Sequence, residues 1–179
     1  MNVLQIVILC VLVQVAILAI LWYIVKVRKH NEKLEISFRE TLDLVEIPVV
    51  TFRVPGKDGL IKVNLIVDTG ASECYINTDS MQLFDENKMD YYHSDDNEMC
   101  SSTTVTTTDG NVYLELHYGE CMFMTPFVMV DLNNTIEYIK NTCGVTVAGM
   151  IGTTFLKANK SIVDFEVFKL KVNKNANRR

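Results

Sequence analysis

Positive charge is scarce in this 179-residue sequence. Lysine and arginine number 17 against 22 aspartates and glutamates, which gives a formal net charge of −5. Residues 79–99 alone contain seven acids and one lysine. A nucleic-acid-binding face needs a basic patch, because phosphate contacts supply most of its affinity. The composition therefore argues against nucleic acid as a partner, and we expect residues 79–99 to form a solvated acidic loop with one helical turn.

Metal-binding patterns are missing as well. The three histidines and five cysteines show neither the spacing of a zinc site nor that of a C-x-x-C motif. His93 with its neighbouring aspartates matches no calcium loop. We therefore predict no metal and no cofactor. The four cysteines after residue 45 are expected to be ordinary thiols, although they could also form two disulfides in an oxidising compartment. They are Cys74, Cys100, Cys121 and Cys143.

The amino-terminal 25 residues lack charged side chains altogether. Between Val3 and Val25 the only polar side chains are Gln5, Cys10 and Gln14, so 23 residues are available, against the roughly 20 that span a bilayer as a helix. Trp22 and Tyr23 close the run, where aromatic residues meet lipid headgroups. A secretory signal peptide would have a basic start and a small-residue cleavage site, and neither is present. We predict a transmembrane anchor over residues 1–25.

The flanking charges predict the orientation of this anchor. No lysine or arginine precedes the apolar run, and five follow it within residues 26–39. The positive-inside rule then places the rest of the chain on the cytoplasmic side of the membrane, as a single-pass protein. Residues 26–44 mix both charge signs with Leu34, Phe38 and Leu42 at helical spacing. We expect them to form a charged stalk that can be helical.

From Val45 to Arg179 the sequence has the texture of β-structure. Short runs rich in Val, Ile, Phe and Tyr are bounded by Gly, Pro, Asn or Asp, which is typical of strands and hairpins. The stretch PGKDG at residues 55–59 predicts the turn of one hairpin. The segment of residues 45–179 is long enough to form a β-barrel core, so we predict one all-β domain there.

Three features follow one another within this domain. Asp68-Thr69-Gly70 comes directly after the apolar run NLIV, residues 64–67. A threonine-rich segment with a tight turn follows at residues 100–110. Met150 and Ile151 then stand directly before Gly152, ahead of a second amphipathic run. Any one of these features is common, but the ordered combination is specific.

This arrangement resembles the retropepsin-like aspartic proteases, over about residues 45–173. The resemblance implies a closed β-barrel with one short C-terminal helix, here preceded by the transmembrane helix. It assigns catalysis to Asp68, Thr69 and Gly70, substrate binding to Ala71, Ser72, Thr106, Thr107 and Thr108, and support of the catalytic loop to Met150, Ile151 and Gly152. The segment at 100–110 takes the place of the family's flap hairpin, although no glycine occurs between Cys100 and Thr108.

The chemistry of peptide hydrolysis explains why a catalytic site would need a carboxylic acid such as Asp68. Without a metal, one carboxylate must take a proton from water while a carboxylic acid polarises the carbonyl. Two carboxyls about 3 Å apart share one proton, for which aspartic proteases are the standard example. Only one D-T/S-G triplet occurs in this chain. The resemblance therefore implies a symmetric homodimer in which Asp68 of each copy contributes to the pair, acting on a peptide or protein substrate.

Two other functions remain open at this point. The domain could be a weak or inactive retropepsin-fold module for membrane-tethered dimerisation or peptide binding, or a purely structural anchored β domain. Asp68 by itself would be an ordinary turn residue beside Gly70. The intact triplet favours a membrane-anchored aspartic endopeptidase, since an inactive descendant has no need to keep it.

Overall fold

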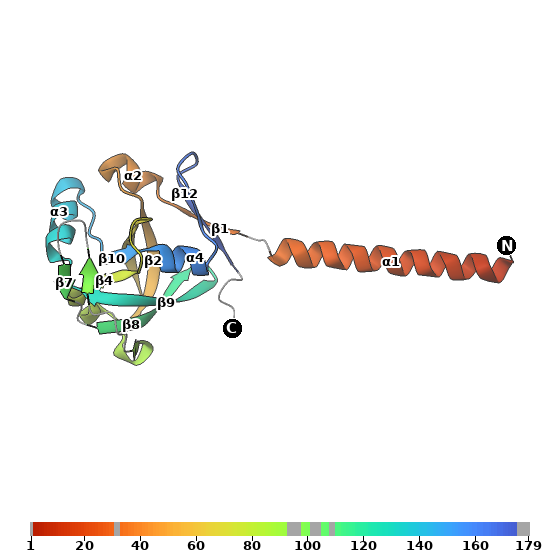
Figure 1. Ribbon diagram of the computed structural model, residues 1–179, viewed down its shortest axis with the longest axis horizontal. Coiled ribbons are helices and arrows are strands. Elements are labelled where there is room, and N and C mark those ends of the chain that lie inside the picture. Colours follow the sequence, from red (N-terminus) through yellow and green to blue (C-terminus); the bar gives the residue numbers. More distant parts are fainter. Residues whose placement is uncertain (1, 31–32, 93–97, 101–104, 108–109, 175–179) are drawn as a thin grey trace.

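The computed structural model describes residues 2–30, 33–92, 98–100, 105–107 and 110–174, and of residues 3–11, 26–30, 45, 98–100 and 105–107 the backbone alone. Six strands close into a barrel (Figure 1). They are β2 (Val49–Gly56), β3 (Gly59–Val67), β4 (Tyr75–Asn77), β8 (Gly110–Tyr118), β9 (Cys121–Val130) and β10 (Gly149–Ile151). Their order is β2-β3-β10-β4-β9-β8, and β8 pairs with β2 to complete the ring. The predicted closed β-barrel is confirmed.

Alternation of apolar and polar residues builds this barrel. In β2, Val50, Phe52 and Val54 are buried while the intervening Thr51 and Arg53 are exposed, as the two-residue period of a strand requires. The predicted hairpin at residues 55–59 is confirmed, because Gly56 pairs with Gly59. In the centre, the rings of Phe52, Phe123 and Phe155 meet edge to face at centroid distances of 5.8 to 6.4 Å. Each buried phenylalanine stabilises the core by about 1.5–3 kcal/mol.

Two helices lie in the C-terminal part of the domain, one before and one after the last barrel strand, β10. The expected short C-terminal helix is α4 (Thr153–Ala158), which buries Phe155. The second, α3 (Asn133–Cys143), was not predicted. It packs Ile136 and Ile139 against a second apolar cluster outside the barrel, which also contains Met150. Its N-terminal region is joined to the barrel by buried Asn77, whose Oδ1 accepts from the amide of Leu132 at 2.9 Å.

Residues 79–92 of the acidic segment contain regular elements and do not form a solvated loop. The segment contains the 3-10 turns η1 (Thr78–Leu83) and η2 (Glu86–Lys88) and the short strand β5 (Asp90–Tyr92), which pairs with β8. Phe84 and Met89 anchor it in the core. Further on, β6 (Glu98–Cys100) and β7 (Val105–Thr107) pair as an antiparallel hairpin where a flap was expected.

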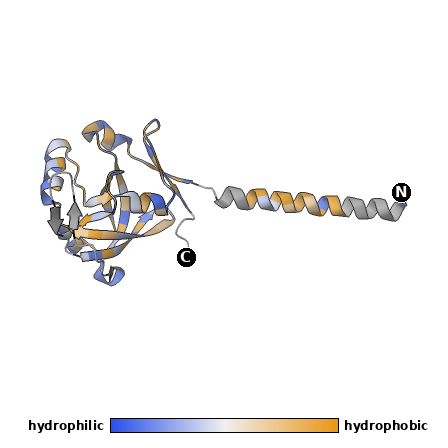
Figure 2. Cartoon of the chain, viewed as in Figure 1, coloured by the Kyte–Doolittle hydropathy of each residue, from blue (hydrophilic) through white to orange (hydrophobic). Residues whose placement is uncertain are grey.

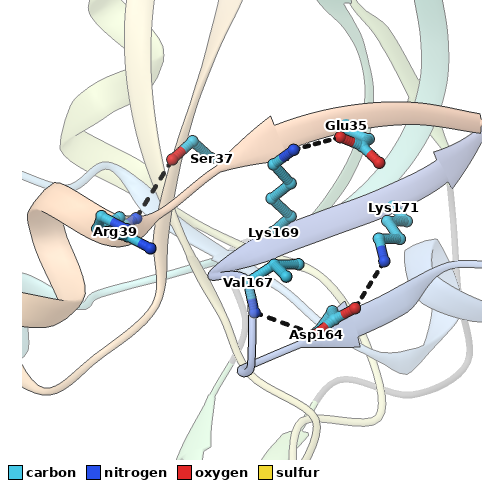
Figure 3. A network of polar contacts seen from close by, with 7 residues as sticks. All are labelled: Glu35, Ser37, Arg39, Asp164, Val167, Lys169 and Lys171. Atoms are coloured by element: carbon cyan, nitrogen blue, oxygen red, sulfur yellow. Dashed lines mark hydrogen bonds and ion pairs between the residues drawn. The ribbon is translucent and has the colours of Figure 1, made fainter.

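A separate sheet joins the two ends of the domain. It has the order β1-β12-β11, with β1 (Lys33–Ser37), β11 (Ile162–Asp164) and β12 (Lys169–Asn173). Lys171 Nζ donates to Asp164 Oδ2 at 2.6 Å, and Lys169 forms an ion pair with Glu35 (Figure 3). We call this the terminal sheet.

Because of the terminal sheet, the folded domain starts earlier in the sequence than expected. Residues 26–44, expected to be a stalk, include all of β1 and most of α2 (Arg39–Val45). Ile36 and Phe38 are each 1% exposed and belong to the main core. The domain in the structure therefore begins at Lys33 and not at residue 45, because β1 completes a sheet with strands from the other end of the chain.

The amino-terminal residues form the helix α1 (Val3–His30). Its large apolar side chains from Leu12 to Val25 are exposed, between 44% at Ile24 and 65% at Leu18, and the described part is coloured as mainly hydrophobic in Figure 2. A search of the described residues finds no helix with the length and apolarity to cross a membrane.

Candidate active site

Asp68 is the first residue after β3, at the mouth of a short loop. Its amide donates to the carbonyl of Ile151 at 3.0 Å, and its carboxylate Oδ1 accepts the amide of Gly70 at 2.8 Å. The side chain is half-buried. In the described part of the chain the carboxylate has no other hydrogen-bond donor, so its second oxygen remains available to a ligand. Asp68 is thus oriented by its own loop and not by a salt bridge.

The strand β10 supports this loop by pairing with the two strands that flank it, β3 and β4. It lies between β3 and β4, parallel to the first and antiparallel to the second, so that Met150 is opposite Ile66 and Tyr75. Met150 and Ile151 are buried, at 8% and 0% exposure. The structure therefore brings the predicted supporting residues directly against the strand that carries Asp68.

Gly152 is required by the closeness of two backbones. A Cβ at this position would lie 2.1 Å from the carbonyl oxygen of Glu73 and 2.7 Å from that of Ala71. Contacts below 3.0 Å force the backbone to move, so the loop and the end of β10 fit together only with glycine here.

Two threonines that the sequence analysis did not single out fasten the other side of the loop. Thr153 donates its amide to the Ala71 carbonyl and its hydroxyl to the Ser72 carbonyl, both at 2.8 Å. Thr154 donates its hydroxyl to the Ser72 carbonyl at 2.9 Å and to the Glu73 carboxylate at 2.6 Å. Both stand at the start of α4, directly after Gly152, and no pattern in the sequence marks their hydroxyls as partners of this loop. The loop of residues 68–73, the catalytic loop from here on, is therefore anchored on both sides.

The residues predicted to bind substrate differ in how they are placed. Ala71 is half-buried against the outer apolar cluster, and the Ser72 side chain is exposed while its carbonyl is occupied by α4. Thr106 and Thr107 lie on β7, opposite Met99 and Glu98, and their side chains are outside the description. Thr108 lies outside the described residues.

Thr69 is exposed beside Asp68 and makes no hydrogen bond within the described part of this chain. Its hydroxyl is thus free to bind a group from outside the chain.

Two titratable groups with raised pKa values lie behind the catalytic loop. Burial raises the pKa of the Cys74 thiol to about 11, and its Sγ accepts the amide of Gly152 at 3.4 Å. Burial, followed by the neighbouring Tyr113, Glu73 and Cys74, raises the pKa of Tyr92 to about 12. Both groups stay protonated and uncharged at neutral pH, so neither adds a charge behind the loop. Cys74, Cys121 and Cys143 are free thiols.

Within the described residues, no group of three or more His, Cys, Asp or Glu side chains is arranged to hold a metal ion. The described site therefore offers one oriented carboxylate, that of Asp68, which has one oxygen free of hydrogen bonds and the exposed Thr69 beside it.

Comparisons with known proteins give a distant likeness to solved structures and none to a family model. No family model matches the sequence, and no curated protein matches it. Among solved structures, the chain is similar to the crystal structure of a retropepsin-like aspartic protease from Rickettsia conorii. The two share 14% sequence identity with a TM-score of 0.44, and the match covers 79% of this chain and 98% of the other.

Proposed function

We propose that this chain is a membrane-anchored, retropepsin-like aspartic endopeptidase that hydrolyses peptide bonds as a homodimer. The observation that carries the proposal is the placement of Asp68, a half-buried acid at the end of β3 with its carboxylate oriented by Gly70. The surrounding loop is fixed by Gly152, Thr153 and Thr154, so the acid has little freedom to leave this orientation. Such preorganisation is what a catalytic carboxylate needs and a surface turn does not.

In the proposed mechanism, two copies of Asp68 meet across a two-fold axis. Their carboxyls share one proton, because like charges so close cannot both ionise. The ionised member takes a proton from water, which attacks the scissile carbonyl, and the protonated member donates to the carbonyl oxygen. The carboxyl that took the proton from water then gives it to the amide nitrogen, the C–N bond breaks, and the other carboxylate takes back its proton from the hydroxyl of the collapsing adduct. The exposed hydroxyl of Thr69 would hydrogen-bond the partner's loop and hold the two acids in register. The titration of such a pair belongs to both carboxyls together.

The proposed substrate is a peptide or protein segment, and the proposed location is the cytoplasmic face of a membrane. The anchor would be α1, whose exposed apolar side chains between Leu12 and Val25 have no cover from the domain. The lysines and arginines within residues 26–39 support a cytoplasmic orientation. Confinement to a membrane raises the effective concentration of the chains and so favours pairing.

The test is cleavage of a peptide library by the full chain in neutral detergent, at acidic and neutral pH, with and without pepstatin. Asp68→Asn should reduce cleavage by about 10²–10⁴-fold, the usual contribution of a general acid or base. Asp58→Asn is the matched control, because it removes the same charge from the exposed turn between β2 and β3. Equal cleavage by Asp68→Asn, or no cleavage by the unaltered chain under any of these conditions, would rule out the peptidase.

A further inference from the structure

A cavity of about 570 Å³ lies away from the catalytic loop, at the seam where the barrel closes. The seam is narrow, because β2 and β8 pair only through Arg53 and His117. Of the lining residues on β3, Asn64 is the nearest to Asp68 in the sequence and precedes it by four residues, which is about 13 Å along an extended strand. The cavity is thus separate from the candidate active site, and its size suits a small organic ligand.

Three basic side chains form one row across this seam. Lys62 on β3 is directly opposite Arg53 on β2, and Arg53 is directly opposite His117 on β8. Directly opposed residues project from the same face of a sheet and lie side by side, where like charges repel. The row therefore places two permanent positive charges next to each other in a chain whose net charge is negative.

The charges of Arg53 and Lys62 are not neutralised by the described part of the protein. None of the residues lining the cavity is acidic. Glu115 on the neighbouring strand β8 is paired with His117, with 3.1 Å between Nε2 and Oε2. No ion pair or side-chain hydrogen bond of Arg53 or Lys62 occurs among the described residues. Two adjacent cations beside a cavity are an arrangement that a dianion would stabilise.

The uncharged residues that line the cavity indicate which kind of organic group would carry the dianion. Leu60 and Tyr118 supply apolar and aromatic surface. Thr51 and Asn64 bond each other at 2.7 Å, which fixes the polar wall between the two strands. An inorganic ion would fill only a small part of the cavity, which leaves room for an organic group beside the anion.

We propose that this cavity, named the seam site, binds a phosphate monoester that carries an apolar or aromatic group. The guanidinium of Arg53 can grip two phosphate oxygens at once, and the ammonium of Lys62 supplies the second positive charge. A carboxylate would satisfy only one of these charges. The organic part would lie against Leu60 and Tyr118.

The experiment is a calorimetric titration of the full chain carrying Asp68→Asn, in neutral phosphate-free detergent at constant ionic strength. This variant makes the result independent of any peptidase activity. Phenyl phosphate should bind saturably, and inorganic phosphate and benzoate should bind at least about tenfold more weakly. Arg53→Gln and Lys62→Gln should each weaken phenyl phosphate binding by about tenfold or more.

Lys57→Gln is the matched control, since Lys57 is exposed on the adjoining turn and does not line the cavity. It should leave the affinity unchanged. An equal loss in Lys57→Gln would show a general charge effect and overturn the seam site, as would the absence of saturable phenyl phosphate binding. Benzoate binding as tight as phenyl phosphate would overturn the phosphate assignment. Neutral nanodiscs with and without phosphatidate show whether the monoester comes from a lipid, because only a lipid source gives competition with soluble phenyl phosphate.

Discussion

Gly152 lies so close to the catalytic loop that no side chain fits at this position. A Cβ there would overlap the carbonyl oxygens of Glu73 and Ala71, which are backbone atoms and cannot rotate away. The same backbone donates its amide to buried Cys74. A single hydrogen replaced by a methyl group would therefore displace the segment that orients Asp68.

We expect Gly152→Ala to lower the free energy of unfolding by about 1–3 kcal/mol, the usual cost of overpacking. It should also lower any peptide cleavage, because the catalytic loop must shift. Denaturant unfolding of the full chain measures the first effect. Gly144→Asn is the control, since Gly144 ends α3 with a left-handed φ of 71° and has no neighbour within 4 Å of a built Cβ. A Gly152→Ala protein as stable as the unaltered chain would show that the loop adapts freely.

The residues of the site were predictable to different degrees. Asp68, Gly70 and Gly152 stand in a motif, so their roles could be proposed from the sequence. Thr153 and Thr154 could not, because a hydroxyl that fastens a loop 81 residues earlier leaves no periodic signal. Hydrogen bonds between distant segments appear only when the fold is known.

Among the elements, local ones were predicted and distant pairings were not. The hairpin of β2 and β3 is encoded by alternation and by a turn of two residues, Lys57 and Asp58. By contrast, β1 pairs with β12 from the opposite end of the domain, with Lys33 opposite Asn173. The sequence of β1 is compatible with a strand and with part of an amphipathic helix, and only pairing with β12 makes it a strand. The start of the domain was therefore misplaced by 12 residues, from Lys33 to Val45.

This boundary leads to a prediction about fragments. A fragment of residues 33–179 should fold, whereas one of residues 45–179 should not. The shorter fragment loses the buried Ile36 and Phe38 and uncovers Leu170 and Val172 of β12. Removing one such side chain costs about 2–5 kcal/mol, against a total stability of about 5–15 kcal/mol for a domain. Circular dichroism during heating measures the difference, and equal cooperative melting of both fragments would contradict it.

The terminal sheet should also make stability depend on acid. The hydrogen bond from Lys171 lowers the pKa of Asp164, and the one from Lys169 lowers the pKa of Glu35. A carboxyl whose pKa is lower in the folded state stabilises the fold above its unfolded pKa and loses this effect as the pH falls through the folded pKa. The contribution of both pairs is therefore present at neutral pH and lost in acid.

The double variant Lys169→Gln, Lys171→Gln should flatten the loss of stability in acid, because it removes the cause of both shifts. The measurement is the denaturant midpoint between about pH 7 and about pH 2. Lys157→Gln serves as the control, as it removes an exposed charge from α4 instead. An unchanged pH profile in the double variant would mean that these exposed pairs are screened by solvent.

At the scale of the whole molecule, the proposed chemistry needs more than one chain supplies. One barrel carries one Asp68, and a shared-proton pair needs two carboxyls. The exposed hydroxyl of Thr69 and the exposed apolar length of α1 are two surfaces that a single copy leaves unused. In the proposed function, the first would contact the catalytic loop of a second copy, and the second would lie in a membrane where copies meet.

This dependence on two copies can be tested by mixing. If each dimer needs Asp68 from both chains, co-expression of unaltered and Asp68→Asn chains in equal amounts leaves unaltered pairs as about a quarter of all dimers. Cleavage should then fall to about half of that from the same amount of unaltered chain alone. Co-expression with Asp58→Asn, whose change lies in the turn between β2 and β3, should cause no loss. If the Asp68→Asn chain causes no more loss than this control, each chain acts alone and the catalytic pair is not formed between copies.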